Sequence, residues 1–211
     1  MSKYLTEFIG TFFLVLVICC TVIGGAGNFA PLAIGSILMV MIFAGGHISG
    51  AHYNPAVTLA VLMRGKCSVA DAPIYMVSQI AGGALAALVA QMILPADALN
   101  AVAAKEISHV PALIAELLGT FALCYVVLNT ATSKGTEGNS FYGLAIGFTV
   151  LACAYALGGI SGGAFNPAVA VGVSVAGLFS WANIWVFLVG NFAAAALAAI
   201  VFKIQNSHYD D

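Results

Sequence analysis

The stretch GGAFNPAVAV, residues 162–171, places an asparagine and a proline inside a long apolar segment. The same tripeptide, Asn-Pro-Ala, occurs earlier in GAHYNPAVTL, residues 50–59. A single Asn-Pro pair is an ordinary turn signal. Two copies in similar apolar surroundings indicate a shared structural role instead.

The composition is typical of a protein whose main solvent is lipid. Hydrophobic residues make up 62% of the 211 residues and charged residues only 7%, whereas soluble domains carry about 25% charged residues. A hydrocarbon core of about 30 Å requires roughly 20 helical residues. We expect six spanning segments, at residues 4–23, 31–48, 72–94, 110–129, 141–157 and 181–202. They are continuously apolar rather than alternating, which favours helices over a β-barrel.

The sequence also contains an internal repeat. EFIGTF at residues 7–12 returns as ELLGTF at residues 116–121. ISGAHYNPAV at residues 48–57 returns as ISGGAFNPAV at residues 160–169, with seven of ten residues identical. Each copy holds three expected spans, so the second must enter the membrane from the opposite side. The predicted fold class is therefore an all-α membrane protein with an inverted 3+3 repeat. We expect one channel domain over residues 1–211, with repeat 1 at residues 1–95 and repeat 2 at residues 109–205.

Each Asn-Pro-Ala begins a short apolar segment, at residues 55–63 and 167–176. About ten residues at about 1.5 Å each cover roughly 15 Å, half of the hydrocarbon thickness. Asparagine is a good N-cap, and proline is favoured at the first helical position. We therefore predict two re-entrant half-helices that meet at the midplane, where their positive N-terminal ends repel cations. Their asparagines would cap with the side-chain oxygen and direct NH₂ donors into a cavity. The predicted midplane site is Asn54, Pro55, Ala56, Asn166, Pro167 and Ala168.

These motifs make the chain resemble the aquaporin or major intrinsic protein family. The resemblance is carried by HISGAHYNPAVT at residues 47–58, GISGGAFNPAV at residues 159–169 and the two Glu-x-x-Gly-Thr-Phe copies, and it covers essentially the whole chain. It implies six spanning helices plus two half-helices, a pore in every protomer and a homotetramer.

The resemblance also implies roles for four polar residues. Glu7 and Glu116 would face inward and hold the re-entrant loops, although Glu7 can also be read as a helix-end carboxylate near the interface. His47 and His52 would lie near the cytoplasmic half of the pore, and their alternative role is that of hydrogen-bonded packing residues.

One position departs from the family pattern, in which arginine usually follows the second Asn-Pro-Ala. This chain has Val169 there, as some plant vacuolar-type members of the family do. The other constriction positions map to Ile34, Ala154 and Gly163. None of these four side chains donates a hydrogen bond, and pore diameter and lining donors set selectivity in such channels. We therefore predict a wide, apolar filter that matches neither the usual water filter nor the usual glycerol filter.

The six basic residues predict the orientation. With the N-terminus in the cytoplasm and six crossings, only Lys105 falls outside, and five fall inside: Lys3, Arg64, Lys66, Lys134 and Lys203. That distribution follows the positive-inside rule. Both termini are thus expected in the cytoplasm, and the protein in the cell's inner or plasma membrane.

The function predicted is passive passage of water and small uncharged solutes, such as ammonia, urea, glycerol or hydrogen peroxide. The alternative is a secondary transporter, since those also use inverted repeats and discontinuous helices; the spans hold no further cluster of carboxylates for ion coupling. A structural junction protein is a third possibility. We expect no enzyme activity, because no nucleophile–base pair occurs. We also expect no metal, cofactor or nucleic-acid partner, since the five cysteines lack ligand spacing and no basic patch exists.

Overall fold

The structure, a computed structural model, describes residues 1–206. Its long helices, each with the length and apolar composition to cross a membrane, are α1 (Ser2–Ile23), α2 (Ala30–Ser49), α4 (Asp71–Ile93), α6 (His109–Val127), α7 (Tyr142–Ser161) and α9 (Ile184–Gln205). Two short helices interrupt this series, α3 (Pro55–Arg64) and α8 (Pro167–Val175). The predicted fold class is confirmed. The last residues of the expected single domain, 207–211, lie outside the described part.

The connections carry the remaining helical turns. They are η1 (Gly27–Phe29), α5 (Ala96–Asn100), the π-helical turn η2 (Leu128–Thr132), η3 (Lys134–Thr136) and η4 (Trp181–Asn183). Helix α7 runs past the predicted end at residue 157 to Ser161. Its stop is Gly162, whose φ of 103° lies in the left-handed region that glycine adopts most easily. The last span begins as the turn η4 rather than as an α-helix.

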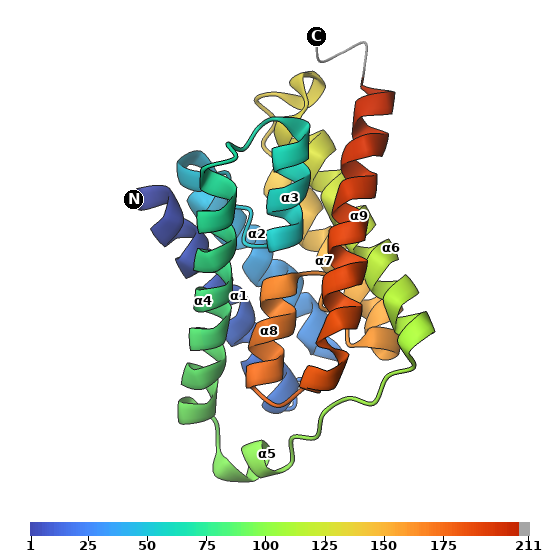
Figure 1. The fold of residues 1–211 in the computed structure, drawn as a ribbon. Helices are drawn as coiled ribbons and strands as arrows, with labels where there is room; N and C mark the ends of the chain where they lie inside the picture. Colours follow the sequence, from blue (N-terminus) through green and yellow to red (C-terminus); the bar gives the residue numbers. More distant parts are fainter. Residues whose placement is uncertain (207–211) are drawn as a thin grey trace.

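The two half-helices lie in the middle of the bundle, α3 in one half and α8 in the other (Figure 1). Helix α3 packs against α4 and α9, and α8 packs against α4, α1 and α9. Each half-helix therefore contacts long helices of both repeats. This interlocking fixes the two Asn-Pro-Ala segments relative to each other.

Helices α2 and α7 come very close at two glycines that are 112 residues apart, the same spacing as the Asn-Pro-Ala copies. A Cβ atom added at Gly35 would lie 2.7 Å from the carbonyl oxygen of Gly147. No side chain fits there, and the two repeats meet backbone to backbone.

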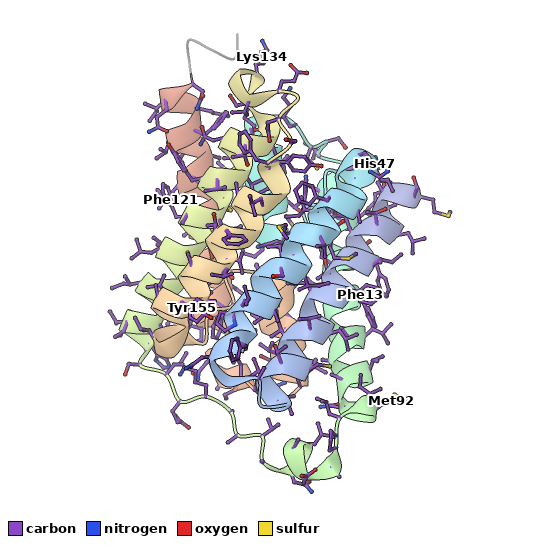
Figure 2. All side chains as sticks on the ribbon, turned by 180° about the vertical axis from the view of Figure 1, so that it is seen from behind. Phe13, His47, Met92, Phe121, Lys134 and Tyr155 are labelled. Atoms are coloured by element: carbon purple, nitrogen blue, oxygen red, sulfur yellow. The ribbon has the colours of Figure 1, made fainter. Side chains whose placement is uncertain are left out.

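The ends of the bundle differ in what they carry. The N-terminus and the end of α9 lie toward one end, and α5 with the connection to α6 lies at the other (Figure 1). The outer surface is apolar: the side chain of Phe13 points away from the bundle (Figure 2), and it is 41% exposed. Such a surface suits the acyl chains of a bilayer.

Candidate functional site

Both half-helices begin at a buried asparagine that caps them. The Oδ1 atom of Asn54 accepts hydrogen bonds from the amides of Ala56, at 2.8 Å, and Val57, at 3.4 Å. The Oδ1 atom of Asn166 accepts from Ala168, at 2.9 Å, and from the next amide, at 3.4 Å. Proline fills the first helical position in both, where the missing N–H costs nothing. The sequence predicted this capping.

The NH₂ groups of these asparagines join the two loops. Nδ2 of Asn54 donates to the carbonyl oxygen of Phe165 at 2.9 Å. Nδ2 of Asn166 donates to the carbonyl oxygen of Tyr53, also at 2.9 Å. The sequence predicted that these donors would face the cavity, and one N–H of each is instead used between the repeats. An amide carries two N–H donors, so each asparagine keeps a second one, and both side chains line the central cavity.

Glu7 holds the first re-entrant loop. Its carboxylate, fully buried, accepts hydrogen bonds from the Ser49 hydroxyl at 2.6 Å and from the backbone amides of His52 and Tyr53 at 3.0 and 2.7 Å. Nε2 of Gln79 on α4 adds a bond at 2.7 Å. The structure thus places Glu7 inside the bundle and not at the interface.

Glu116 does the same for the second loop. Its buried carboxylate accepts from the Ser161 hydroxyl at 2.7 Å and from the amides of Ala164 and Phe165 at 3.0 and 2.7 Å. Nδ2 of Asn191 on α9 completes the set at 2.9 Å. The two carboxylates therefore hold the loops by the same pattern of four hydrogen bonds, so neither has an oxygen left for a solute.

Sequence reasoning missed Gln79 and Asn191, although a signal was present. Both are buried amides within apolar helices, and they are 112 residues apart. This is the same spacing that relates the Asn-Pro-Ala copies. A polar residue repeated at the internal spacing inside a membrane span indicates a specific buried partner.

The residues before the asparagines adopt an uncommon backbone conformation. Tyr53 has a φ of 50° and Phe165 a φ of 48°, in the left-handed region that is costly for aromatic residues. The amides of both are held by the buried carboxylates. Their rings occupy the space beside Gly10 and Gly119, the glycines of the two Glu-x-x-Gly-Thr-Phe motifs. Each motif thus supplies a carboxylate for the loop backbone and a gap for the loop's aromatic ring.

A cavity of about 380 Å³ runs beside the two asparagines. Its lining includes all four residues predicted to form the filter: Ile34, Ala154, Gly163 and Val169. They come from α2, α7, the second re-entrant loop and α8. Most of the remaining wall is aliphatic, contributed by α1, α2, α6 and α7.

The two histidines lie in different places. His52 lines the 380 Å³ cavity, and its Nδ1 lies 3.1 Å from the hydroxyl of Thr58. His47 is exposed and lines a second cavity of about 480 Å³. It lies toward the same end of the bundle as Lys134 (Figure 2), which lines that cavity too.

A cation that the filter prediction did not include also lines the central cavity. Lys105, in the connection between α5 and α6, contributes to the same wall as Gly163 and Val169. Its backbone amide donates to the carbonyl oxygen of Leu178 at 2.9 Å. Nothing periodic marks this connection in the sequence, so only the three-dimensional fold brings Lys105 to the cavity.

Known proteins resemble this chain along most of its length. The sequence model of the family described as Major intrinsic protein matches residues 1–202. "Glycerol uptake facilitator protein-like 6" of Lactiplantibacillus plantarum is 34% identical, over 98% of this chain and 99% of that protein. "Probable aquaporin NIP4-2" of Arabidopsis thaliana is 32% identical, over 97% of this chain and 74% of that protein. The solved aquaglyceroporin of Plasmodium falciparum has a TM-score of 0.76 at 21% identity, over 98% of this chain and 95% of that one.

Six apolar spans, two half-helices and a central cavity between them define an integral, multi-pass membrane protein of the channel class. The chain belongs to the major intrinsic protein family. Members of this family are channels for water and small solutes such as glycerol, and the family is not one of enzymes.

Proposed function

We propose that this protein is a passive channel for water and small uncharged solutes. The observation that carries the proposal is that the two cavities described above share part of their walls. The 380 Å³ cavity beside the asparagines and the 480 Å³ cavity at one end share four lining residues: Ile42, Ala51, Val127 and Ile146. A path through both would pass the ends of α3 and α8.

The chemistry of this path suits neutral solutes. At its centre the N-termini of two half-helices present partial positive charges, which repel cations. Asn54 and Asn166 each keep one N–H donor for a passing solute. Aliphatic walls hold few other groups that would bind a solute tightly, and weak binding allows rapid passage.

We propose that Ile34, Ala154, Gly163 and Val169 form the selective constriction. Two of these side chains are very small and none donates a hydrogen bond. Because arginine is replaced by valine at position 169, the constriction would also admit solutes wider than water, among them ammonia, urea, glycerol and hydrogen peroxide.

The alternative function is that of a secondary transporter with inverted repeats. Ion-coupled transport requires groups in the membrane that bind the coupling ion. The two carboxylates at membrane depth, Glu7 and Glu116, each accept four hydrogen bonds, two from amides of a re-entrant loop and two from side chains of the long helices. Carboxylates engaged in this way favour a structural role, and hence a channel.

We further propose a homotetramer in the cell's inner or plasma membrane, with both termini in the cytoplasm and the repeats at residues 1–95 and 109–205. The charge distribution supports this orientation, since five of the six basic residues belong to segments at the end where α1 begins and α9 ends. We also propose that the protein has no catalytic residues, cofactor, metal or nucleic-acid partner. The hydrogen-bonded loop carboxylates and the aliphatic lining of the cavity favour this proposal.

Proteoliposomes that contain the purified protein test the function directly. After an osmotic step, a channel gives rapid shrinkage with a low activation energy and no requirement for an ion gradient. Shrinkage no faster than that of empty liposomes, or flux that requires sodium or a proton gradient, would contradict the proposal. Cross-linking in liposomes and protease access to a C-terminal tag test the tetramer and the orientation.

A further inference from the structure

A lysine, Lys105, lines the central cavity at its outer end. The four proposed filter residues, which line the same cavity, carry no charge. Among the described residues that line this cavity, Lys105 is the only lysine, arginine, aspartate or glutamate. It is half-buried, whereas its neighbours Ala104 and Glu106 are exposed. The side chain of Lys105 is therefore turned inward, as those of Val102 and Ile107 in the same connection are.

Lys105 is held to the second half-helix by its backbone. Its amide donates to the Leu178 carbonyl at 2.9 Å, and the Leu178 amide in turn donates to the Val173 carbonyl of α8 at 2.9 Å. Leu178 and Val173 line the same cavity. The position of Lys105 is thus tied to the helix that carries Val169.

The side chain of Lys105 lies against the second re-entrant loop. Its Cδ atom is 3.5 Å from the point where a Cβ atom of Gly162 would lie. The next residue of that loop is the proposed filter residue Gly163. The aliphatic part of the side chain therefore packs against the loop backbone. Its ammonium group follows two bonds further on, beside the proposed filter.

The ammonium group of Lys105 is available to act on a passing ion. Within residues 1–206, the structure records no hydrogen bond or ion pair at Lys105 Nζ. The nearby wall, which includes Leu178 and Phe179, is apolar. Low-dielectric walls focus the field of a fixed charge along a cleft. A cation that enters this mouth would meet an unneutralised positive charge.

We infer that Lys105 supplies the outer mouth with the positive charge that Val169 does not, and that it determines how strongly the channel rejects cations. The inference rests on the proposed channel function. Lys105, in the connection between α5 and α6, then sets the barrier to cations at the mouth. The four filter residues set the width of the pore. Width and charge selection would then be separable in this protein.

Guanidinium and urea provide a matched pair of probes, since they are similar in shape and differ in charge. We would measure uptake of both into proteoliposomes, together with osmotic water permeability. Lys105→Met keeps an unbranched stem and removes the charge; it should raise the guanidinium-to-urea permeability ratio about tenfold. Lys105→Glu should raise the ratio further, and Lys105→Arg should keep it near the wild-type value. The matched control is Glu106→Gln, which removes a charge from the exposed neighbour and should change the ratio by less than about twofold.

A chemical rescue gives an independent readout. Lys105→Cys treated with aminoethyl methanethiosulfonate regains a lysine-like cation, so its raised guanidinium uptake should return toward the wild-type value. Treated wild-type protein controls for the native cysteines, and treated Glu106→Cys controls for the position. This measurement also replaces Lys105→Met if that variant does not fold.

The possible failures can be told apart. If water and urea pass normally and the guanidinium-to-urea ratio is the same for Lys105→Met, Lys105→Glu and Glu106→Gln, the channel stands and the role of Lys105 is refuted. An untreated Lys105→Cys ratio equal to that of the wild type refutes it as well. If the wild-type protein passes neither water nor urea, the proposed channel function itself fails.

Discussion

Asn54 and Asn166 lie at the centre of the protein, and each donates a 2.9 Å hydrogen bond to the backbone carbonyl of the residue that precedes the other. The two repeats are thereby fastened to each other at the point where their half-helices begin. The same two side chains cap the half-helices and line the cavity. Each asparagine therefore caps a half-helix, joins the two repeats and lines the central cavity.

These three roles predict the effect of Asn54→Asp and Asn166→Asp. An aspartate still caps its helix, but it has no N–H for the facing carbonyl, and the two oxygens then repel each other. We expect a stability loss of about 1–3 kcal/mol for each variant. We also expect lower water flux and a cation leak, because a negative charge lies where two helix ends repelled cations. Stopped-flow and ion-leak assays in liposomes test this.

The matched control is Asn28→Asp, at an exposed position in the turn before α2. It should change neither stability nor leak noticeably. Normal water flux without any leak in both midplane variants would remove Asn54 and Asn166 from the transport path.

Glu116→Ala should lower the yield of folded protein more than the flux through each folded channel. The substitution leaves the buried donors of Ser161, Asn191 and two backbone amides without their acceptor, and each such loss costs about 1–3 kcal/mol. Thermal unfolding in detergent and flux per folded channel measure the two effects separately. Glu106→Ala, at an exposed site, is the control. Normal stability of Glu116→Ala combined with abolished flux would indicate instead a direct role of Glu116 in transport.

The glycine of each Glu-x-x-Gly-Thr-Phe motif should tolerate no side chain. Gly119→Ala would push a methyl group into the ring of Phe165, and overpacking of this kind costs about 1–3 kcal/mol. Gly159→Ala is the matched control, since a Cβ atom there meets nothing within 4 Å; alanine should stabilise that helical position by about 0.5–1 kcal/mol. Equal melting temperatures for the two variants would show that the ring of Phe165 does not require the space beside Gly119.

Much of this architecture could be predicted from the sequence because the membrane limits the choices. Apolar stretches of spanning length have to be helices, and a repeated Asn-Pro after glycine-rich segments predicts capped half-helices. The internal repeat then places the two caps opposite each other. The structure confirms the fold built from these elements, while the filter formed by Ile34, Ala154, Gly163 and Val169 stays a prediction.

Other features depend on three-dimensional packing that no local pattern contains. The backbone of Lys105 is held by a hydrogen bond to Leu178, 73 residues later in the chain. The exchange of hydrogen bonds between the two asparagines requires the relative positions of α3 and α8. Gln79 and Asn191 are an intermediate case. Their shared spacing is visible in the sequence, but the carboxylates to which they donate hydrogen bonds are not.

The central claim, a wide filter without arginine, is tested most directly by the urea-to-water permeability ratio of Val169→Arg in proteoliposomes. Only folded, purified protein is compared, because Ala154 and Gly163 provide no site for a guanidinium group and the arginine variant must first be shown to fold. Val169→Met adds bulk without charge and is measured alongside. We predict that arginine narrows the constriction and lowers the urea-to-water ratio by at least about tenfold, with a smaller decrease for methionine. A ratio equal to that of the wild type in well-folded Val169→Arg would contradict the claim and place the selective constriction elsewhere.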